Sequence, residues 1–370
     1  MKIRDVEALM LQGRGQQGAY GAPYGLLVRV TTDEGLVGYG ETDSMPSVVK
    51  AVVEAPYLNE LMSGLKALLV GEDPLEIERL WRRMARGTTN IARDGVTLEA
   101  MAAVDLALWD IKGKALAQPV CRLLGPVYRD RVKIYATHPL GRDLGETARF
   151  AAALRDRGMP AVKFGWRPLG PDAEADEAIV RTLRQAIGEE VELLIDGGNA
   201  WDAETAIERC KRFEPYRLFW LEEPLPPYDT AQYRRLTSAV ETRIAAGELS
   251  SSRQELARLI AESGIGVVQV DVSRVGLTEA MRVAAVAREH GVVCVNHTYG
   301  YDLNLAASLH FVAALPETSL FEYQATANEI RDSLVRDRPR PVDGLLAVPQ
   351  APGLGVEIDE AALARFVVRP

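Results

Sequence analysis

Seven ionisable residues recur at regular intervals through the second half of the sequence, each at or near the end of a short apolar run. They are Lys163, Asp196, Glu222, Glu248, Asp271, His297 and Glu322. Successive members lie 23 to 33 residues apart. A single acid in such a place is often a loop residue or a helix N-cap, but seven ionisable residues in register are poorly explained in that way. The pattern indicates one site that combines carboxylates, a lysine and a histidine.

The three middle carboxylates belong to consecutive runs and predict a metal site. Asp196, Glu222 and Glu248 would repel one another if brought together, and each would protonate unless a cation neutralised them. Oxygen ligands without His or Cys favour a hard divalent cation over zinc. We therefore expect these three residues to bind Mg²⁺.

Potential bases stand on both sides of this metal site. Asp271 can orient the His297 imidazole and raise its basicity, although a buried structural hydrogen bond is the alternative. Lys163 lies on the other side, inside an apolar strand where a lysine is costly without a partner. The set suits removal of a proton α to a carboxylate, because a metal can stabilise the developing negative charge. Glu322 could hydrogen-bond the second carboxylate oxygen if a raised pKa keeps it protonated.

The apolar runs alternate with helical stretches, which predicts how the site is assembled. The expected strands are 132–137, 161–165, 192–197, 218–224, 243–248, 267–272, 292–297 and 319–324. Nearly continuous apolar strands are buried on both faces and therefore parallel. Eight of them with seven intervening helices favour a βα barrel, whose active site lies at the carboxyl ends of the strands. A doubly wound open sheet is the alternative, and it is disfavoured because no GxGxxG motif opens a helix.

The first third of the chain has another pattern. Residues 1–40 read as strands with a hairpin around TTDEG, and residues 47–118 read as helices. Strands and helices segregated in this way predict an α+β domain, with Gly125-Pro126 as a plausible boundary.

Composition narrows the class of protein. The 370 residues carry a net charge of −9 with Lys and Arg scattered among the acids, which argues against nucleic acid as a partner. The three cysteines are far apart in the sequence and favour reduced thiols in the cytoplasm, with neither a disulfide framework nor a CxxC metal site. No apolar run predicts a signal peptide or a membrane span.

Taken together, the motifs resemble the enolase superfamily in its mandelate racemase branch. The resemblance covers essentially the whole chain and rests on ALWDIKGKALAQPVCRLLG (107–125), AVKFG (161–165), LLIDGGNAW (193–201), WLEEP (220–224), AAGE (245–248), QVDVSRVGLTEA (269–280), VNHTYG (295–300), LFEYQ (320–324) and PGLGVEID (352–359). Two loops depart from the family pattern: Asn199 is shifted by one position, and a glycine pair is reduced to Gly276.

The resemblance implies a fold, a cofactor and residue roles. It implies an α+β capping domain over residues 1–125, a modified TIM barrel of (β/α)7β type over 126–340, and a segment at 341–370 that returns to the capping domain. The Mg²⁺ ligands would be the first glutamate of WLEEP with Asp196 and Glu248, and not Glu223. The Asp271–His297 pair would be the base, and Glu322 would face the carboxylate of a small-molecule substrate. Relatives of this kind are commonly homo-oligomers.

A missing lysine decides between the reactions of this branch. Racemases that resemble this chain carry Lys-x-Lys after the second barrel strand and use the second lysine as a base, but Gly165 stands there. Lys163 is then left with an electrostatic role beside the substrate carboxylate. His297 can still remove the α-proton and afterwards protonate a departing β-hydroxyl group on the same face. We therefore expect a dehydratase that converts an acid sugar into a 2-keto-3-deoxy acid.

The alternatives are a racemase or epimerase of a 2-hydroxy acid, with Lys163 or water as the second base, and a non-catalytic, ligand-binding relic of the fold. Muconate cycloisomerase and dipeptide epimerase chemistry is disfavoured, because those branches resemble barrels with a lysine where Asp271 stands.

Four further residues are candidates for binding the substrate: Tyr24, His138, Trp166 and Arg167. Each has a plain alternative. Tyr24 could simply pack, His138 could be a satisfied loop residue, and Trp166 could fill the space above Gly165. Arg167 could pair with a second carboxylate of a diacid or be solvated.

Overall fold

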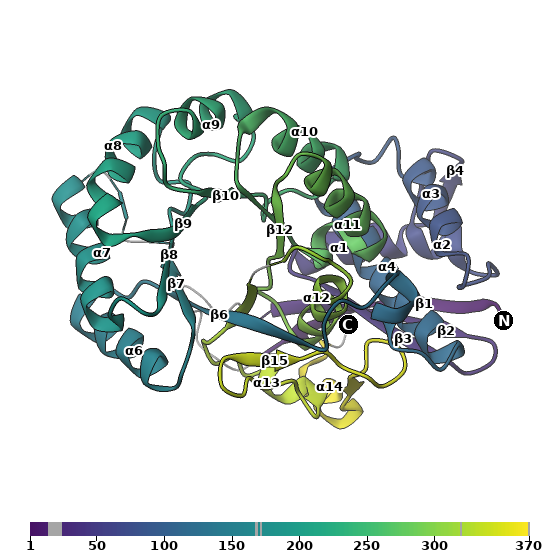
Figure 1. The fold of residues 1–370 in the computed structure, drawn as a ribbon. Coiled ribbons are helices and arrows are strands. Elements are labelled where there is room, and N and C mark those ends of the chain that lie inside the picture. The colour runs from purple at the N-terminus through teal and green to yellow at the C-terminus, as the bar shows by residue number, and fades with distance from the viewer. Residues whose placement is uncertain (14–23, 167–168, 171, 319, 369–370) are drawn as a thin grey trace.

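The computed structural model describes residues 1–13, 24–166, 169–170, 172–318 and 320–368. Figure 1 shows a ring of strands and helices built from the middle of the chain, with the N-terminal elements gathered at one side of it. No helix in these described ranges is long and apolar enough to cross a membrane.

The N-terminal elements form an antiparallel sheet covered by helices, as the sequence predicts. The sheet has the order β1 (Ile3–Gln12), β2 (Tyr24–Thr32) and β3 (Val37–Thr42), and the predicted hairpin joins β2 to β3. The other elements are α1 (Pro46–Glu54), β4 (Tyr57–Asn59), β5 (Met62–Ser63), α2 (Leu65–Leu69), α3 (Ile77–Gly87), α4 (Val96–Ala115) and α5 (Val120–Leu124). Helix α4 packs directly on β3. Glycine at positions 38 and 40 allows this close approach, since a Cβ at either position would overlap the α4 backbone.

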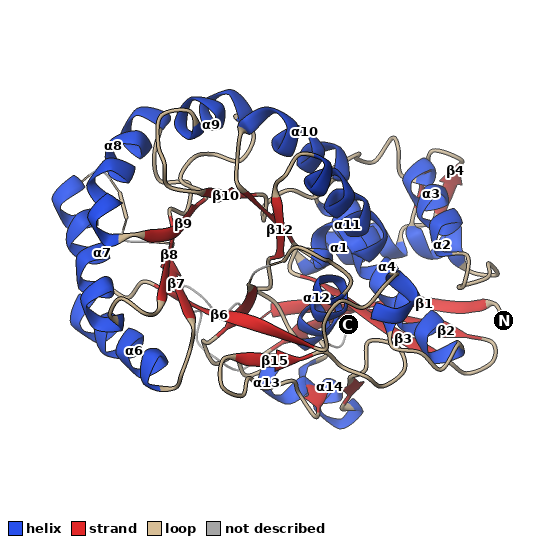
Figure 2. Ribbon diagram, in the orientation of Figure 1, coloured by secondary structure: helices blue, strands red, loops and turns tan. Residues whose placement is uncertain are grey.

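The next part of the chain alternates strands with helices. The strands are β6 (Arg131–Pro139), β7 (Ala161–Gly165), β8 (Glu192–Asp196), β9 (Leu218–Glu222), β10 (Ile244–Ala246), β11 (Val267–Val270), β12 (Val293–Asn296) and β13 (Phe321–Gln324). The helices between them are α6 (Leu144–Asp156), α7 (Ala173–Ile187), α8 (Ala203–Phe213), α9 (Thr230–Thr237), α10 (Arg253–Ser263), α11 (Val272–Glu289) and α12 (Asp302–Ala313), with a 3-10 turn η1 (Glu214–Tyr216) after α8. Figure 2 shows the strands as an inner ring and the helices outside them.

These strands form a nearly closed barrel, which confirms the predicted α/β barrel rather than an open sheet. Parallel pairing runs in the order β12-β11-β10-β9-β8-β7-β6-β13. The seam between β12 and β13 is bridged by a side chain, because the Glu322 N–H donates to Asn296 Oδ1 at 3.0 Å. Next to the seam, β15 (Leu345–Ala347) pairs antiparallel with the first residues of β6, the neighbour of β13.

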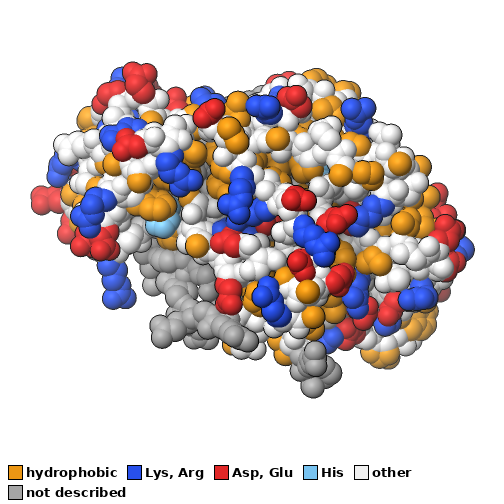
Figure 3. Space-filling view, turned by 90° about the horizontal axis from the view of Figure 1, so that it is seen from below, with side chains coloured by type: hydrophobic (Ala, Val, Ile, Leu, Met, Phe, Trp, Pro, Cys, Tyr) orange, Lys and Arg blue, Asp and Glu red, His pale blue; other side chains and the backbone are white. Residues whose placement is uncertain are grey.

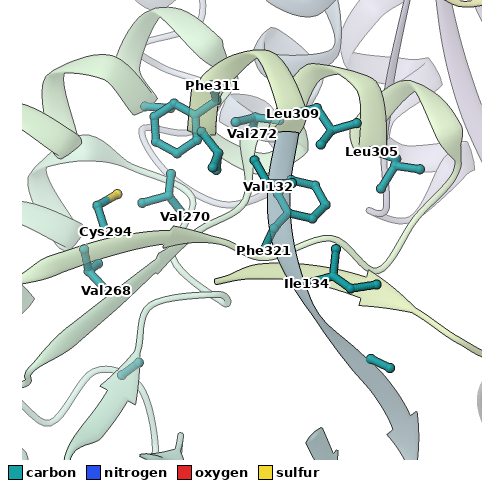
Figure 4. Packing of buried hydrophobic residues seen from close by; sticks show 14 of the residues in the cluster. Val132, Ile134, Val268, Val270, Val272, Cys294, Leu305, Leu309, Phe311 and Phe321 are labelled. Carbon is teal, nitrogen blue, oxygen red and sulfur yellow. The ribbon is translucent and has the colours of Figure 1, made fainter. Parts of the chain in front are cut away.

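Apolar side chains fill both faces of the barrel wall. The interior holds a cluster that includes Tyr135, Leu194, Trp220 and Val295, in which the Tyr135 and Trp220 rings meet edge to face. Outside, residues of β11, β12 and β13 form one apolar cluster with residues of α11 and α12, as Figure 4 shows for Val268, Val270, Cys294, Phe311 and Phe321 among others. Burial on both faces explains why these strands read as continuous apolar runs.

The last elements of the chain are α13 (Arg331–Leu334), β14 (Val335–Arg336), β16 (Glu357–Ile358) and α14 (Glu360–Phe366). This segment contacts the N-terminal domain: the Val368 N–H donates to the Met10 carbonyl oxygen at 2.8 Å, and the Tyr39 hydroxyl donates to Glu360. Strand β15, which lies between β14 and β16 in the sequence, belongs instead to the barrel sheet. The exact domain boundaries stay a prediction from the sequence.

Several strand boundaries differ from the sequence prediction. Strand β10 ends at Ala246 and β12 at Asn296, so Glu248 and His297 lie just past their strands rather than within them. Gly247 has a positive φ of 125°, which turns the chain out of the β10 ladder. Conversely, β6 runs to Pro139, so His138 lies inside a strand and not after it.

The surface carries no extended charge of one sign on the face drawn in Figure 3, where basic and acidic side chains are interspersed. The predicted absence of a nucleic-acid partner is untested and stays a prediction.

The buried His310 imidazole of α12 holds the C-terminal segment and makes the fold sensitive to acid. Its Nδ1 accepts from the Cys121 N–H at 3.2 Å, and its Nε2 bonds the Leu354 carbonyl oxygen at 3.1 Å. Burial lowers the pKa of His310 from 6.5 to about 4. The neutral ring is therefore the form that folds, and protonation would remove the Nδ1 acceptor.

We expect the stabilising effect of His310 to be complete above its unfolded pKa of 6.5 and to fade as the pH falls toward 4. The slope of the unfolding free energy against pH should be steeper than in His310→Gln by up to about 1.4 kcal/mol per pH unit. Urea unfolding between about pH 7 and about pH 4.5 measures this. The exposed His290→Gln variant is the control, and parallel profiles for wild type and His310→Gln would contradict the assignment.

Candidate active site

The predicted metal ligands meet at the carboxyl end of the barrel. Asp196 and Glu222 are the last residues of β8 and β9, and Glu248 follows β10. One carboxylate oxygen from each lies within 4.8 Å of the others, and all three residues are buried. Parallel pairing places Asp196 opposite Glu222. The sheet register therefore forces the carboxylates together.

The acids fit a divalent cation. Burial and the neighbouring carboxylates raise the pKa of Asp196 and of Glu248 well above the usual range. One oxygen of Glu248, Oε2, is buried without a hydrogen-bond donor. An unpartnered buried oxygen among crowded carboxylates is what a hard cation with oxygen ligands satisfies.

Glu223 is excluded from this group, as the resemblance implies. Its Oε1 accepts from the Gly247 N–H at 3.1 Å, so its side chain supports the turn after β10 instead.

Lys163 is not alone, although the sequence showed no partner near it. Its ammonium forms an ion pair with Glu222 and lies 2.8 Å from Glu322 Oε1 and 3.9 Å from Asp196 Oδ2. Burial lowers the pKa of Lys163, but Glu222 and Glu322 outweigh it and hold the pKa well above the usual value. Lys163 is therefore held as a cation. This supports the predicted electrostatic role and argues against a role as a base.

The Asp271–His297 pair forms as predicted. His297 Nδ1 lies 2.6 Å from Asp271 Oδ2, while Asp271 Oδ1 accepts from the Ser273 N–H at 2.7 Å as the N-cap of α11. Asp271 therefore does both things: one oxygen caps helix α11, and the other bonds His297. The Nε2 atom of His297 is left to face Glu248 Oε2 at 3.5 Å and Glu322 Oε2 at 4.0 Å.

The charge state of His297 depends on the acids around it. Burial lowers its pKa, but Glu248, Glu322 and Asp271 together raise it to about 10. A cation held by Glu248 would offset that negative charge and bring the pKa down toward the range in which an imidazole acts as a base.

Glu322 of β13 lies between the lysine and the histidine. Its Oε2 accepts from the Thr298 N–H at 2.8 Å, and its Oε1 faces the Lys163 ammonium. Both contacts are those of an acceptor, so the predicted role of Glu322 as a protonated donor stays a prediction.

Gly165 leaves no room for the lysine that racemases of this branch carry. Gly165 lies opposite Asp196 in the pairing of β7 with β8. A Cβ at position 165 would overlap the Cβ and carbonyl oxygen of Asp196. The metal ligand and a side chain at 165 therefore exclude each other in this backbone.

The site opens into a cavity of about 230 Å³. Its lining includes Lys163, Asp196, Glu248, His297 and Glu322. His138 and Trp166, both predicted to bind substrate, also line it. His138 Nδ1 lies 3.1 Å from the Thr326 hydroxyl, whereas the Trp166 side chain is 45% exposed.

The other two predicted substrate contacts are not placed in this cavity. Tyr24 lies on β2, is 45% exposed and bonds Gln12, and it does not line the cavity. An alternating strand pattern cannot tell such an edge residue from one that reaches over the site. Arg167 lies outside the described residues.

Sequence reasoning missed four polar residues of the cavity: Asp43, Thr137, Arg274 and Tyr299. Arg274 donates from Nη2 to Asp43 Oδ2 at 2.7 Å, which joins α11 to the end of β3. An arginine in the first turn of a helix is ordinarily solvated, so its sequence position gave no signal. Asp43 directly follows the end of β3. An ionisable residue at a strand end was the signal used to find the barrel site, but it was not applied to the strands of the N-terminal domain.

Comparison with known proteins agrees with this geometry. Residues 19–125 match the family described as mandelate racemase / muconate lactonizing enzyme, N-terminal domain, and residues 146–362 match the enolase C-terminal domain-like family. The chain belongs to the enolase superfamily, as its motifs indicated, and it is an enzyme of that superfamily.

Three relatives illustrate the range of activities. A D-galactonate dehydratase of Xanthomonas oryzae pv. oryzae is 34% identical over 95% of this chain and 93% of the relative. The crystal structure of a 3,6-anhydro-D-galactonate cycloisomerase from Zobellia galactanivorans has a TM-score of 0.90 and 30% identity over the full length of both chains. A racemase from Streptomyces coelicolor A3(2) with bound magnesium has a TM-score of 0.88 and 25% identity over 99% of this chain and 100% of that one. The dehydratase relative supports the hydro-lyase class predicted from the sequence.

The metal site is testable without a substrate. We expect Mg²⁺ to raise the thermal unfolding temperature of the wild type, because a ligand bound only by the folded state stabilises it. Asp196→Asn and Glu248→Gln should weaken the apparent Mg²⁺ affinity by about tenfold or more. Glu223→Gln removes an adjacent buried carboxylate outside the triad and should leave the affinity near wild type. Equal losses in all three variants would contradict the assignment.

Substitution of Gly165 should lower Mg²⁺ affinity as much as substitution of a metal ligand, although Gly165 itself does not bind the metal. We expect Gly165→Ala to weaken Mg²⁺ binding, because the added Cβ displaces Asp196. Gly165→Lys should do the same and should not create racemase activity. Calorimetric titration of Mg²⁺ into Gly165→Ala measures the effect, with Gly145→Ala, at an exposed glycine in the first turn of α6, as the control. Unchanged affinity in Gly165→Ala would show that the strands have room to part.

Proposed function

We propose that the protein is an Mg²⁺-dependent dehydratase of an acid sugar. The observation that carries the proposal is that Lys163 is held as a cation by Glu222 and Glu322, while His297 is the one base with an orienting carboxylate among the described cavity residues. One base on one face favours elimination over racemisation, which needs a base on each face.

The substrate carboxylate would bind between Lys163, Glu322 and the acidic triad. Bound Mg²⁺ would supply positive charge that stabilises the carboxylate as negative charge develops on it. The Lys163 ammonium adds to this stabilisation from the other side. The magnesium in the Streptomyces coelicolor racemase structure supports the choice of metal.

His297 would carry the protons in both halves of the reaction. Nε2 takes the α-proton, and the electrons of the C–H bond shift into the substrate carboxylate. They form the double bond between the α- and β-carbons only as the hydroxyl leaves. The bond from the β-carbon to its hydroxyl then breaks, and the imidazolium returns the proton so that water leaves. The resulting enol tautomerises to the 2-keto-3-deoxy acid. Asp271 keeps Nδ1 bonded throughout and stabilises the imidazolium.

A ring-opening version of the same elimination is the second candidate, and the cycloisomerase relative favours it. In that case the departing oxygen belongs to a ring of the substrate and takes the proton from His297 without leaving the molecule. The product then has the mass of the substrate, whereas dehydration gives a product lighter by one water. A racemase, the alternative from the sequence, is disfavoured by the pairing of Lys163 and by the overlap at Gly165.

We also propose a cellular compartment and an oligomeric state for the protein. Three free, buried cysteines are consistent with action in the cytoplasm on a small carboxylate. We also propose a homo-oligomer, which light scattering of the purified protein would test.

A screen against mono- and diacid sugars and their lactone and anhydro forms, with Mg²⁺, tests the function. We expect a 2-keto acid product from at least one of them. His297→Asn should lower turnover by about 10²- to 10⁴-fold, because it removes the proton carrier but not the hydrogen-bonding shape. His290→Asn, which changes an exposed histidine outside the cavity, is the matched control. Turnover that survives His297→Asn would overturn the mechanism.

A further inference from the structure

We infer that the end of β3 in the N-terminal domain positions the catalytic dyad: Glu41 and Asp43 reach across to the two helices that follow Asp271 and His297. The inference rests on the proposed role of His297. Strand β3 contacts both α11 and α12. Residues 41 and 43 are two apart, so an extended backbone directs both side chains to the same face.

Glu41 supplies the N-terminal cap of α12 from another domain. Its Oε1 accepts from the Tyr301 N–H at 2.7 Å, and its Oε2 accepts from the Leu303 N–H at 3.2 Å. Glu41 is 1% exposed, and the N-cap residue Tyr301 makes no side-chain cap of its own. The unpaired N–H groups of a helix start need acceptors, and the two Glu41 side-chain oxygens supply them.

The start of α12 in turn holds the dyad. Asn304, in the first turn of α12, donates from Nδ2 to Asp271 Oδ1 at 3.1 Å. Asp271 Oδ2 then bonds His297 Nδ1. The loop that carries His297 also ends at Tyr301, whose N–H is bonded by Glu41. Displacement of the α12 start would therefore move both members of the dyad.

Asp43 acts on the other helix. Its Oδ2 accepts from Arg274 Nη2 at 2.7 Å, and Arg274 lies in the first turn of α11, the helix that Asp271 caps. The pair is partly shielded, with side-chain exposures of 22% and 17%. The end of β3 thus contacts both helices whose first turns fix Asp271, which explains how a domain outside the barrel can tune the base.

Burial raises the pKa of Glu41 to about 8, and the Tyr301 and Asn304 N–H groups oppose this rise. The contacts by themselves define the role, because both oxygens accept from the start of α12.

Imidazole NMR tests the inference without any substrate. The chain has four histidines, so ¹⁵N-labelled rings can be resolved and His297→Asn identifies the His297 signal. We expect Glu41→Gln to shift the His297 Nδ1–H resonance and leave those of His138 and His290 in place, because the amide nitrogen cannot accept from α12. Asp43→Asn should shift the same resonance and is the second variant if Glu41→Gln fails to fold.

Glu7→Gln is the matched control, since Glu7 is a carboxylate of the same sheet whose ion pair is with Arg29 of β2 and not with a barrel helix. A His297 resonance unchanged in the folded β3 variants, or moved equally by Glu7→Gln, would overturn the inference.

Kinetics then separate positioning from general damage. Glu41→Gln and Asp43→Asn should lower kcat by about tenfold to a hundredfold, because a base misplaced by about 1 Å loses that much. KM should stay within about threefold, and Mg²⁺ affinity should be unchanged, since neither residue contacts the triad. A parallel loss of Mg²⁺ affinity and kcat would mean that β3 serves the fold alone. A failed substrate search would leave the NMR result intact, so the two proposals fail separately.

Discussion

The excess of buried negative charge at the mouth of the barrel is the constraint on which the site depends. Six carboxylates lie within it: Asp196, Glu222, Glu223, Glu248, Asp271 and Glu322, each at most 3% exposed. Opposite them stand Lys163 and, when protonated, His297, whereas the nearby Arg274 is paired with Asp43. With all six acids ionised, four negative charges then remain, which a folded protein cannot leave unpaired in a poorly solvated site. A divalent cation neutralises two of these charges, so metal binding also stabilises the folded site.

The same charge distribution assigns opposite tasks to the two nitrogen bases. Lys163 contacts Glu222 and Glu322 directly and is held as an ammonium, so it can attract a carboxylate but cannot accept a proton. His297 is held by Asp271 through Nδ1 and turns Nε2 toward the cavity. Two groups that could both have served as bases are thus separated by their surroundings into an electrostatic group and a proton carrier. Gly165 completes this asymmetry, because its close approach to Asp196 leaves no room for a second lysine.

The barrel could be predicted because burial on both faces imprints continuous apolar runs on the sequence. The ionisable residues at the ends of those runs marked the site, since parallel strands bring their carboxyl ends together. The exact strand ends could not be read in this way: Gly247 turns the chain before Glu248, and nothing in the apolar pattern of VVCVN separates Asn296 from His297. Contacts between domains, such as Glu41 with the start of α12, leave no periodicity at all. The partners of Lys163 were hidden for the same reason, because they come from strands 59 and 159 residues further along the chain.

The account predicts one base on one face of the substrate, and hydrogen exchange tests that claim most directly. A turned-over acid sugar would be incubated with enzyme and Mg²⁺ in D₂O, and the unreacted fraction examined by NMR for deuterium at the α-carbon and for its configuration. If His297 alone handles the proton, any deuterium enters with complete retention of configuration, and none enters in His297→Asn. Deuterium in both epimers, or exchange that persists in His297→Asn, would mean that Lys163 or water acts as a second base and that the assignment of Lys163 as a locked cation is wrong.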